Sequence, residues 1–261
     1  MKNILILLTA GSLLLSACGA GNNSKEAQTA DSRRDAAKTI SDAKLQPFML
    51  GGIYFFHGYG GAQETFDKLF KAQMSHKPGD AGFTDELHKV YTEYFYYPFK
   101  TEDGEGARKT LSEYWEMGDK ASYEKGMNEL LTEGHQSHYE RLSKEGAKPA
   151  NADEQEQLAF IIAHRADFPK GGIKAWDIAR YVNNTAQGYA AGYLTKEEGD
   201  ARLAPLWAMA HQHYSSWDEY WKGYNMGRKF WGGDKENDAA FDKDVAGMQQ
   251  GDYSMYRYMK W

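Results

Sequence analysis

Apolar residues recur at steps of three and four from Phe48 to the C-terminus, and no segment shows the alternation of a half-buried strand. The clearest stripe runs through residues 119–142 and consists of Tyr123, Met127, Leu130, Leu131, Gly134, His138 and Leu142. Such a stripe is the buried face of an amphipathic helix. The pattern predicts an all-α fold, a single multi-helix domain, in which residues 119–142 form one continuous helix.

Two helices nearer the C-terminus carry capping signals. The segments "TKEE" (195–198) and "SWDE" (216–219) have the spacing of a capping box, in which a hydroxyl residue precedes a glutamate by three positions. We expect one helix from 196 to about 213 and a second that begins after the serine. Glycine commonly closes a helix, so Gly232 predicts the end of the second one.

Glycines four residues apart occur in two of the predicted helices. Gly188 and Gly192 lie in a helix predicted over 172–193, and Gly223 and Gly227 lie in the helix that follows Ser216. A glycine inside a helix costs about 1 kcal/mol relative to alanine, so we expect these positions to permit close backbone approach. We predict that the two helices cross there.

The N-terminus has the features of an export signal. Lys2 precedes an apolar or small run over residues 4–15, which is too short to span a bilayer. The run ends in "LSAC" (15–18), which resembles the lipobox of bacterial lipoproteins. The resemblance implies cleavage before Cys18, and Gly19 in place of aspartate implies sorting to the outer membrane of a Gram-negative envelope.

Cys18 is the only cysteine, so it has no disulfide partner within the chain. Acylation would account for an unpaired thiol in an exported protein. Two or three acyl chains, such as palmitate, anchor a protein stably because each buried methylene contributes about 0.8 kcal/mol. We therefore expect the chain to be held at the membrane through lipid on Cys18.

Composition divides the chain into three parts. We predict a signal peptide over 1–17, the lipidated cysteine and a disordered tether over 18–44, and a helical domain over 45–261. The tether is assigned because its polar residues and alanines offer little apolar surface to bury. The formal net charge is −6 and no basic run of five or more occurs, which argues against nucleic acid as a partner.

The segment "IYFFHGYGG" (53–61) resembles the first strand and the oxyanion turn of an α/β-hydrolase. That fold also needs alternating strands and a Gly-x-Ser-x-Gly nucleophile turn, and neither is present in the sequence. We interpret the segment as a short apolar helix over 50–57 that is closed by the following glycines. A transglycosylase is disfavoured as well, because such enzymes resemble one another around a Glu-Ser dipeptide that this chain lacks.

Histidines and acidic residues that could hold a metal fall in "EGHQSH" and "HQH". They are Glu133, His135, His138, His211 and His213. Neither a His-Glu-x-x-His pattern nor a cysteine ligand accompanies them. We expect no metal, no cofactor and no catalytic set, with His138 packed on the apolar stripe.

The most distinctive stretch runs over residues 175–231. Its features are "AWD" followed by Arg180, "GYAAGYLTKEE", "SSWDEYWKGY" and "GRKFW", preceded at 114–135 by "YWEMGDKASYEKGMNELLTEGH". This stretch resembles the bacterial family catalogued as domain of unknown function 1266, over about 110–233. The resemblance implies an all-helical domain and carries no catalytic residues.

A group of polar residues on the 172–193 helix is the candidate binding cluster. A step of 100° per residue places Asp177, Arg180 and Asn184 on one side together with Trp176, whereas Ile178 and Val182 take the core side. On the helix after Ser216, Arg228 lies among aromatic residues and needs a partner. We predict that Asp177 pairs with Arg228 as a clamp between the two helices. The alternative is that the polar side is simply solvated.

Three functions remain open from the sequence. The first is a non-enzymatic binding module of the envelope, such as an inhibitor or immunity protein, that recognises a protein or a small envelope ligand through the cluster. The second is a cell-wall or small-molecule hydrolase that uses carboxylates such as Asp177 and Glu133. The third is a scaffold subunit of an envelope complex, with "SMYRYMKW" (254–261) either as a docking strip or as a cap on the domain.

Overall fold

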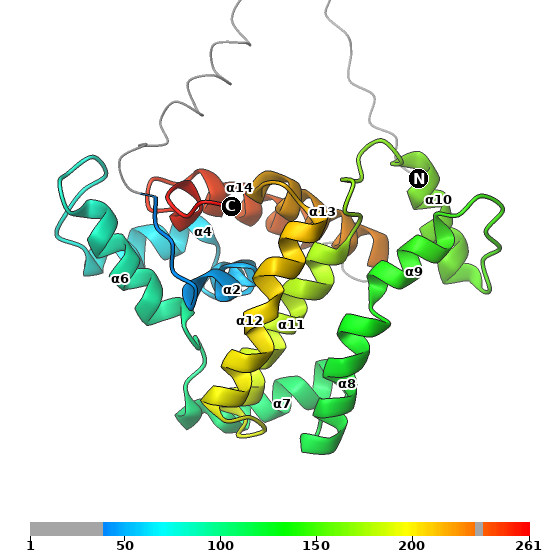
Figure 1. The fold of residues 1–261 in the computed structure, drawn as a ribbon, viewed down its shortest axis with the longest axis horizontal. Helices are drawn as coiled ribbons and strands as arrows, with labels where there is room; N and C mark the ends of the chain where they lie inside the picture. The colour runs from blue at the N-terminus through cyan, green and yellow to red at the C-terminus, as the bar shows by residue number, and fades with distance from the viewer. Residues whose placement is uncertain (1–38, 233–236) are drawn as a thin grey trace, which may run out of the picture. The chain divides into compact units, whose positions relative to one another are not determined.

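The computed structural model describes residues 39–232 and 237–261. Every regular element in this part is a helix, which confirms the all-α prediction (Figure 1). The one strand-like pairing among the described residues is a bridge between Ile40 and Met259. None of the described helices is long and apolar enough to cross a membrane. The predicted signal peptide and Cys18 lie outside the described residues.

The helices follow one another with short connections. In chain order they are α2 (Leu45–Met49), α3 (Gly52–Gly58), α4 (Ala62–Glu64), the π-helix η1 (Thr65–Phe70), α5 (Lys71–Gln73), α6 (Phe83–Phe95), the 3-10 turn η2 (Thr101–Asp103), α7 (Gly104–Trp115), α8 (Lys120–Thr132), α9 (His135–Leu142), α10 (Ala152–Ala163), α11 (Lys174–Ala190), α12 (Lys196–His213), α13 (Trp217–Trp231), α14 (Asp238–Gln250) and the 3-10 turn η4 (Met255–Arg257).

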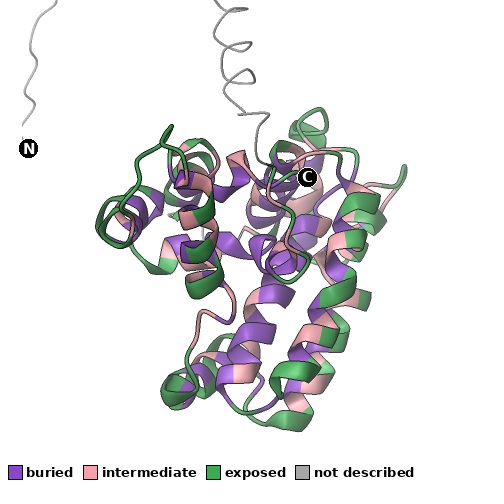
Figure 2. Cartoon of the chain, turned by 60° about the vertical axis from the view of Figure 1, so that its left-hand side comes forward, coloured by how far each residue is buried: buried purple, intermediate pink, exposed green. Residues whose placement is uncertain are grey.

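The centre of the fold is α11, which packs against α7, α8, α9, α12 and α13. Nearly all of its residues are buried, and Figure 2 shows buried residues concentrated in the middle of the fold. Ile178 and Val182 face the core as predicted. Asp177, Arg180 and Asn184 are also buried, so the idea of a solvated polar side is wrong. A helix surrounded by others has no side left for water.

The capping signals are confirmed at both predicted starts. Thr195 and Glu198 cap each other's backbone at the head of α12. Ser216 accepts a hydrogen bond from the backbone amide of Glu219, whose own carboxylate binds Ser215 instead. Gly232 ends α13 in the left-handed conformation, with φ of 74°.

The continuous helix predicted over 119–142 is wrong. The chain breaks after Thr132, and α9 restarts at His135. Gly134 is the N-cap of α9, and a Cβ on it would meet the carbonyl of Leu130 and stand 2.6 Å from Oδ2 of Asp177. The apolar spacing carries on across the break because both helices pack against α11.

The predicted crossing at the four glycines is confirmed at one of them. A Cβ on Gly227 of α13 would lie 2.6 Å from the Cβ of Trp176 on α11, so the two backbones approach closely there. Gly188 of α11 faces Tyr123 of α8 instead. Gly192 lies beyond the end of α11, with φ of 79°.

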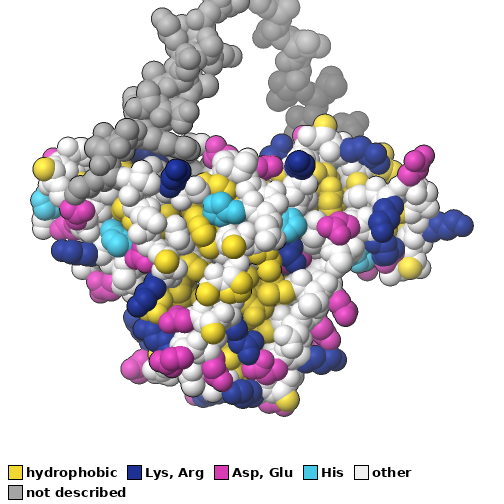
Figure 3. Space-filling model, in the orientation of Figure 1, with side chains coloured by type: hydrophobic (Ala, Val, Ile, Leu, Met, Phe, Trp, Pro, Cys, Tyr) yellow, Lys and Arg dark blue, Asp and Glu magenta, His cyan; other side chains and the backbone are white. Residues whose placement is uncertain are grey.

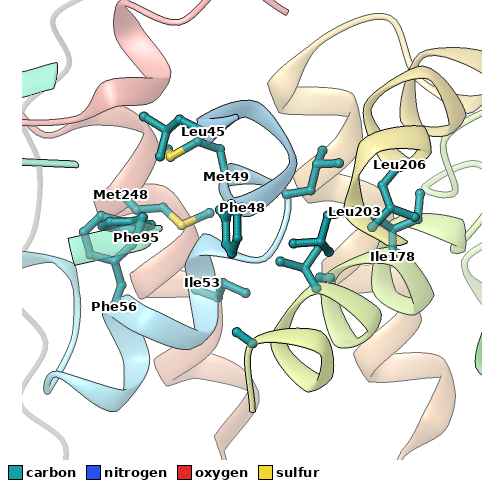
Figure 4. Packing of buried hydrophobic residues seen from close by; sticks show 14 of the residues in the cluster. Leu45, Phe48, Met49, Ile53, Phe56, Phe95, Ile178, Leu203, Leu206 and Met248 are labelled. Atoms are coloured by element: carbon teal, nitrogen blue, oxygen red, sulfur yellow. The ribbon is translucent and has the colours of Figure 1, made fainter. Parts of the chain in front are cut away.

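The main core joins the N-terminal helices to the C-terminal half of the chain. In Figure 4, apolar side chains of α2 and α3 lie against those of α6, α11, α12 and α14. A separate small cluster holds α9 and α10 to the rest. Its buried members are Leu142, Ile161, Ile173, Met226 and Phe230.

The C-terminal strip folds back onto the domain. Tyr256 is buried and donates a hydrogen bond to the carbonyl of Met49 at 2.7 Å. The indole of Trp217 donates to the carbonyl of Met259, which pairs with Ile40. The strip is therefore a cap, and the packed part of the chain begins a few residues before 45.

Candidate functional site

The buried carboxylate of Asp177 is the centre of the candidate site. Asp177 lies in the first turn of α11 and is fully buried. Its two oxygens accept hydrogen bonds from the backbone amides of His135 and Gln136, at 3.1 and 3.0 Å. These amides are the first two of α9, where a helix favours a negative charge. The break at Gly134 is what aims them at the carboxylate.

Arg180 supplies the positive charge. Its guanidinium donates a short hydrogen bond to Asp177, one turn earlier on the same helix. It also lies over the ring of Trp176, 3.7 Å from the centroid, and 5.8 Å from that of Trp115. The cation is thus paired and stacked, which is what a buried guanidinium requires.

The predicted clamp between Asp177 and Arg228 is wrong. Arg228 donates to Asp238 of α14 at 2.8 Å and stacks on Phe241 at 3.7 Å. Each arginine therefore contacts an acidic residue and an aromatic ring, but the two arginines use different partners. Asp177 is taken by Arg180 because residues three apart on a helix lie on one face. Four of the five candidate residues therefore lie on α11, and the fifth, Arg228 of α13, is paired separately with Asp238 of α14.

His135 joins the assembled group and holds a fixed tautomer. A guanidinium can only donate, and one of its nitrogens lies 2.8 Å from Nδ1 of His135. Nδ1 is therefore the acceptor, and the neutral ring carries its proton on Nε2. The ring packs edge to face on Trp176, with centroids 4.5 Å apart. About a third of the side chain is exposed.

Burial and the neighbouring Arg180 guanidinium lower the pKa of His135 from 6.5 to about 3. The unfolded chain then binds a proton between about pH 6.5 and pH 3 that the folded chain does not. We expect the free energy of unfolding to fall with acidification across this range, by less than about 1.4 kcal/mol per pH unit because the ring is partly exposed. Thermal unfolding at several pH values would measure this.

The matched variant is His135→Asn, whose amide oxygen can accept from Arg180 but does not titrate. Its stability should fall less steeply than that of the wild-type chain between pH 6.5 and 5, above the range in which most carboxylates protonate. Parallel slopes for the two proteins would show that His135 is not the group responsible.

Aromatic rings form a partly exposed rim around this buried pair. Trp231, at the end of α13, lies 5.7 Å from Trp176 and is 45% exposed. Trp115, at the end of α7, is half-buried, and its neighbour Tyr114 is 77% exposed. We call Trp115, His135, Trp176, Arg180 and Trp231 the Arg180 cluster. It combines partly exposed indole rings and an imidazole ring, about a third exposed, with a support fixed by charge pairing.

Asn184 lies one turn beyond Arg180 and is fully buried. Its amide oxygen accepts a hydrogen bond from Asn183 at 3.3 Å, and its backbone carbonyl accepts one from Tyr123 at 3.2 Å. It therefore contributes to packing of α11 against α8 and does not reach the exposed rim.

The histidines and acidic residues that were considered as metal ligands do not converge. Among the described residues no three His, Cys, Asp or Glu side chains are placed to hold an ion. His138 is half-buried and lies near Glu154 and against the ring of Phe230. The expectation that it is packed in the core is therefore wrong. His211 lies against Trp261 with the rings stacked at 4.6 Å.

Sequence reasoning missed His135, Trp115 and Trp231 as members of the cluster. The signal for His135 is the glycine before it, which interrupts an otherwise good helix and frees two amides. Trp115 carries no comparable signal, since it reaches Arg180 only through the packing of α7 on α11. Sequence reasoning also missed the contact between His57 and Asp244. Nδ1 of His57 lies 2.8 Å from one carboxylate oxygen of Asp244, and the other oxygen accepts a hydrogen bond from the backbone amide of Ala62 at 3.3 Å.

Comparison with known proteins supports the resemblance described above. The profile of the family described as Protein of unknown function (DUF1266) matches residues 98–261, which includes the whole Arg180 cluster. No solved structure matches the chain.

Two proteins of Escherichia coli (strain K12) are similar to parts of the chain. "Uncharacterized protein YbeR" is 25% identical over 132 residues, which cover 46% of this chain and 56% of YbeR. "Uncharacterized protein YbeU" is 37% identical over 62 residues, which cover 24% of this chain and 26% of YbeU. The chain thus spans about half the length of one relative and about a quarter of the other.

Proposed function

We propose that the chain, which belongs to the family described as Protein of unknown function (DUF1266), is a non-enzymatic binding module of the cell envelope. The family description names no reaction, so the proposal rests on this chain's own residues. Lipid on Cys18 would hold the module at the membrane, most simply the outer one. The Arg180 cluster would contact the partner, and an inhibitor or immunity protein is the particular form we favour.

The exposed Trp231 carries the proposal. A tryptophan that is 45% exposed beside a rigid, charge-paired support has the composition of an interface hot spot, where Trp, Tyr and Arg dominate the binding energy. The buried Asp177–Arg180 pair fixes the rim before any partner arrives, which reduces the ordering cost of binding. Nε2 of His135 adds one directed hydrogen-bond donor.

A hydrolase built on Asp177 has less support. Both oxygens of Asp177 accept hydrogen bonds inside the fold, and the side chain is fully buried. A general base must reach the proton that it abstracts. Glu133 is exposed and lies next to the cluster in sequence, and the two-carboxylate mechanism would require a second accessible carboxylate beside it.

Trp231→Ser tests the proposal without disturbing the buried pair. The full-length chain, solubilised and immobilised, is exposed to envelope and secreted fractions of the source cells and their competitors. We expect a stoichiometric partner whose affinity falls by about 2 kcal/mol or more in the variant, roughly thirtyfold in Kd.

Ile162→Ser is the matched control, since Ile162 is 61% exposed and lies on α10, a helix that carries no residue of the Arg180 cluster. It should retain the partner fully. If the Trp231→Ser variant retains as much of the partner as the wild-type chain does, the Arg180 cluster is not part of the interface.

A further inference from the structure

Arg180 keeps hydrogen-bond donors that the fold does not use. A guanidinium carries five N–H groups and no acceptor. Nε of Arg180 donates to the carbonyl of Trp176 at 3.3 Å, and Nη2 donates to Asp177 and to Nδ1 of His135. These bonds leave both N–H groups of Nη1 unused. Nη1 is not one of the enclosed polar atoms that lack a partner among the described residues, so it keeps some surface open to a ligand.

His135 holds a second unused donor in contact with the same guanidinium. Its Nδ1 accepts from Nη2 of Arg180 at 2.8 Å, so the ring proton lies on Nε2. Nε2 is likewise absent from the enclosed polar atoms without a partner, and about a third of the side chain is exposed. The two residues therefore offer N–H donors from adjoining groups, and a ligand there must supply acceptors.

The local charge favours an anion. Asp177 contributes one negative charge, and its carboxylate is met by the guanidinium and by the first two backbone amides of α9. The N-terminus of a helix carries about half a positive charge, so the carboxylate is more than balanced. Burial lowers the pKa of His135 first, and the positive charges of Arg180 and His138 lower it further. The His135 ring thus lies in a positive potential.

Other charged groups near the cluster in sequence are exposed. Glu116 ends α7 and Glu133 ends α8, and water and salt screen both of them. The ammonium of Lys174 donates to the carbonyl of Leu131 at 2.9 Å, and so it lies at the same end of α8 as Glu133. In Figure 3, acidic and basic side chains are interspersed over the face that is drawn. Local donors therefore decide the sign of the ligand.

The aromatic rings decide how a ligand can approach the cation. The indole of Trp176 covers a face of the guanidinium at 3.7 Å, and that of Trp115 lies 5.8 Å away. A stacked guanidinium is left with its edge, and a carboxylate binds that edge in plane. Trp231 packs against Trp176 and is 45% exposed, so it adds apolar surface beside the polar edge.

We infer that the Arg180 cluster binds a carboxylate, supplied by an aspartate or glutamate side chain of the protein partner. Its oxygens accept from Nη1 of Arg180 and from Nε2 of His135, and its methylene stem contacts Trp231. The inference rests on the proposed function, because it names the chemistry that the partner presents at this surface. A phosphate group fits less well, since its second negative charge would be placed near Asp177, whose carboxylate lies 3.9 Å from Nδ1 of His135.

A small probe tests the site without the partner. The full-length chain, labelled with ¹⁵N at histidine and held in mild detergent, is titrated with N-acetylglutamate N-methylamide, whose only charge is the side-chain carboxylate. The matched neutral probe is N-acetylglutamine N-methylamide. We expect the carboxylate probe to shift the Nε2 resonance of His135 saturably, with a Kd in the millimolar range. The neutral probe should leave that resonance in place at the same concentrations.

Arg180→Lys should weaken the carboxylate probe by about tenfold or more, because lysine keeps the charge beside Asp177 but lacks Nη1. Arg202→Lys is the matched control, since Arg202 lies on α12 and is paired with Glu124 of α8. It should bind the probe as the wild-type chain does. Thermal melting shows whether each variant is folded, and the wild-type titration decides the inference if Arg180→Lys is not.

The outcomes separate this inference from the proposed function. A His135 resonance that does not respond to the carboxylate probe would overturn the inference, even where a captured partner depends on Trp231. Equal affinity for the neutral probe, or tighter binding of inorganic phosphate, would overturn the assignment to a carboxylate. If the carboxylate probe binds as expected but no protein is captured, the partner is overturned as the source and the site takes a small free acid.

Discussion

Asp177→Ala is expected to lower the free energy of unfolding by about 3 to 5 kcal/mol, the range for breaking a buried ion pair. The substitution leaves the guanidinium of Arg180, which is 7% exposed, without its carboxylate. It also removes the acceptor of the first two amides of α9. Denaturant titration of the wild-type chain and the variant measures the difference.

A double-mutant cycle assigns the partner. Asp177→Ala combined with Arg180→Met should cost clearly less than the sum of the two single substitutions, because the second change removes the orphaned charge. Asp177→Ala combined with Arg228→Met should be close to additive, since Arg228 is paired with Asp238. Coupling with Arg228 and none with Arg180 would contradict the structure.

This result also bears on experiments that seek the partner. Asp177→Ala is a poor probe of the binding surface, since loss of binding in that variant would report loss of folding. Trp231→Ser changes the rim and leaves the buried pair in place, so it separates the two effects.

Gly134→Ala is expected to destabilise the chain by about 2 to 3 kcal/mol, the upper part of the range for overpacking. A methyl group at this position meets the carbonyl of Leu130 and lies 2.6 to 2.7 Å from the carboxylate of Asp177. Neither is a flexible side-chain end, because the carbonyl belongs to α8 and the carboxylate is held by three donors. The backbone φ of −58° is ordinary, so the penalty is steric alone. Thermal unfolding measures it.

Gly106→Ala is the matched control. Gly106 lies inside α7, is exposed, and has no atom within 4 Å of the position that a Cβ would take. Alanine favours the helix there, so we expect a gain of about 0.4 to 1 kcal/mol. If both substitutions change the free energy of unfolding in the same direction, close packing at Gly134 is not the cause of its effect.

The local features of the fold could be predicted because they depend on residues close in sequence. The starts of α12 and α13 follow from Thr195 and Ser216, whose side chains bond amides three positions on. The end of α13 follows from Gly232, which adopts a left-handed conformation at no steric cost. The all-α class follows from the spacing of apolar residues at steps of three and four, because each helical turn repeats this spacing.

The break between α8 and α9 could not be predicted from that spacing. Both helices bury one face against α11, so the apolar stripe runs through Gly134 without a gap. The helix is interrupted there because the carboxylate of Asp177, some forty positions later, accepts hydrogen bonds from the two backbone amides that the break exposes. A contact of this range leaves no mark on the local pattern.

The candidate site shows the same division. That Trp176, Asp177 and Arg180 share one side of a helix follows from their spacing along the chain, because each residue turns a helix by a fixed angle. The burial of this side, the pairing of Asp177 with Arg180 and the pairing of Arg228 with Asp238 depend on contacts between helices and could not be derived from that spacing. Which acid meets which base depends on the packing of α9, α13 and α14 around α11, and that packing is fixed by the whole core.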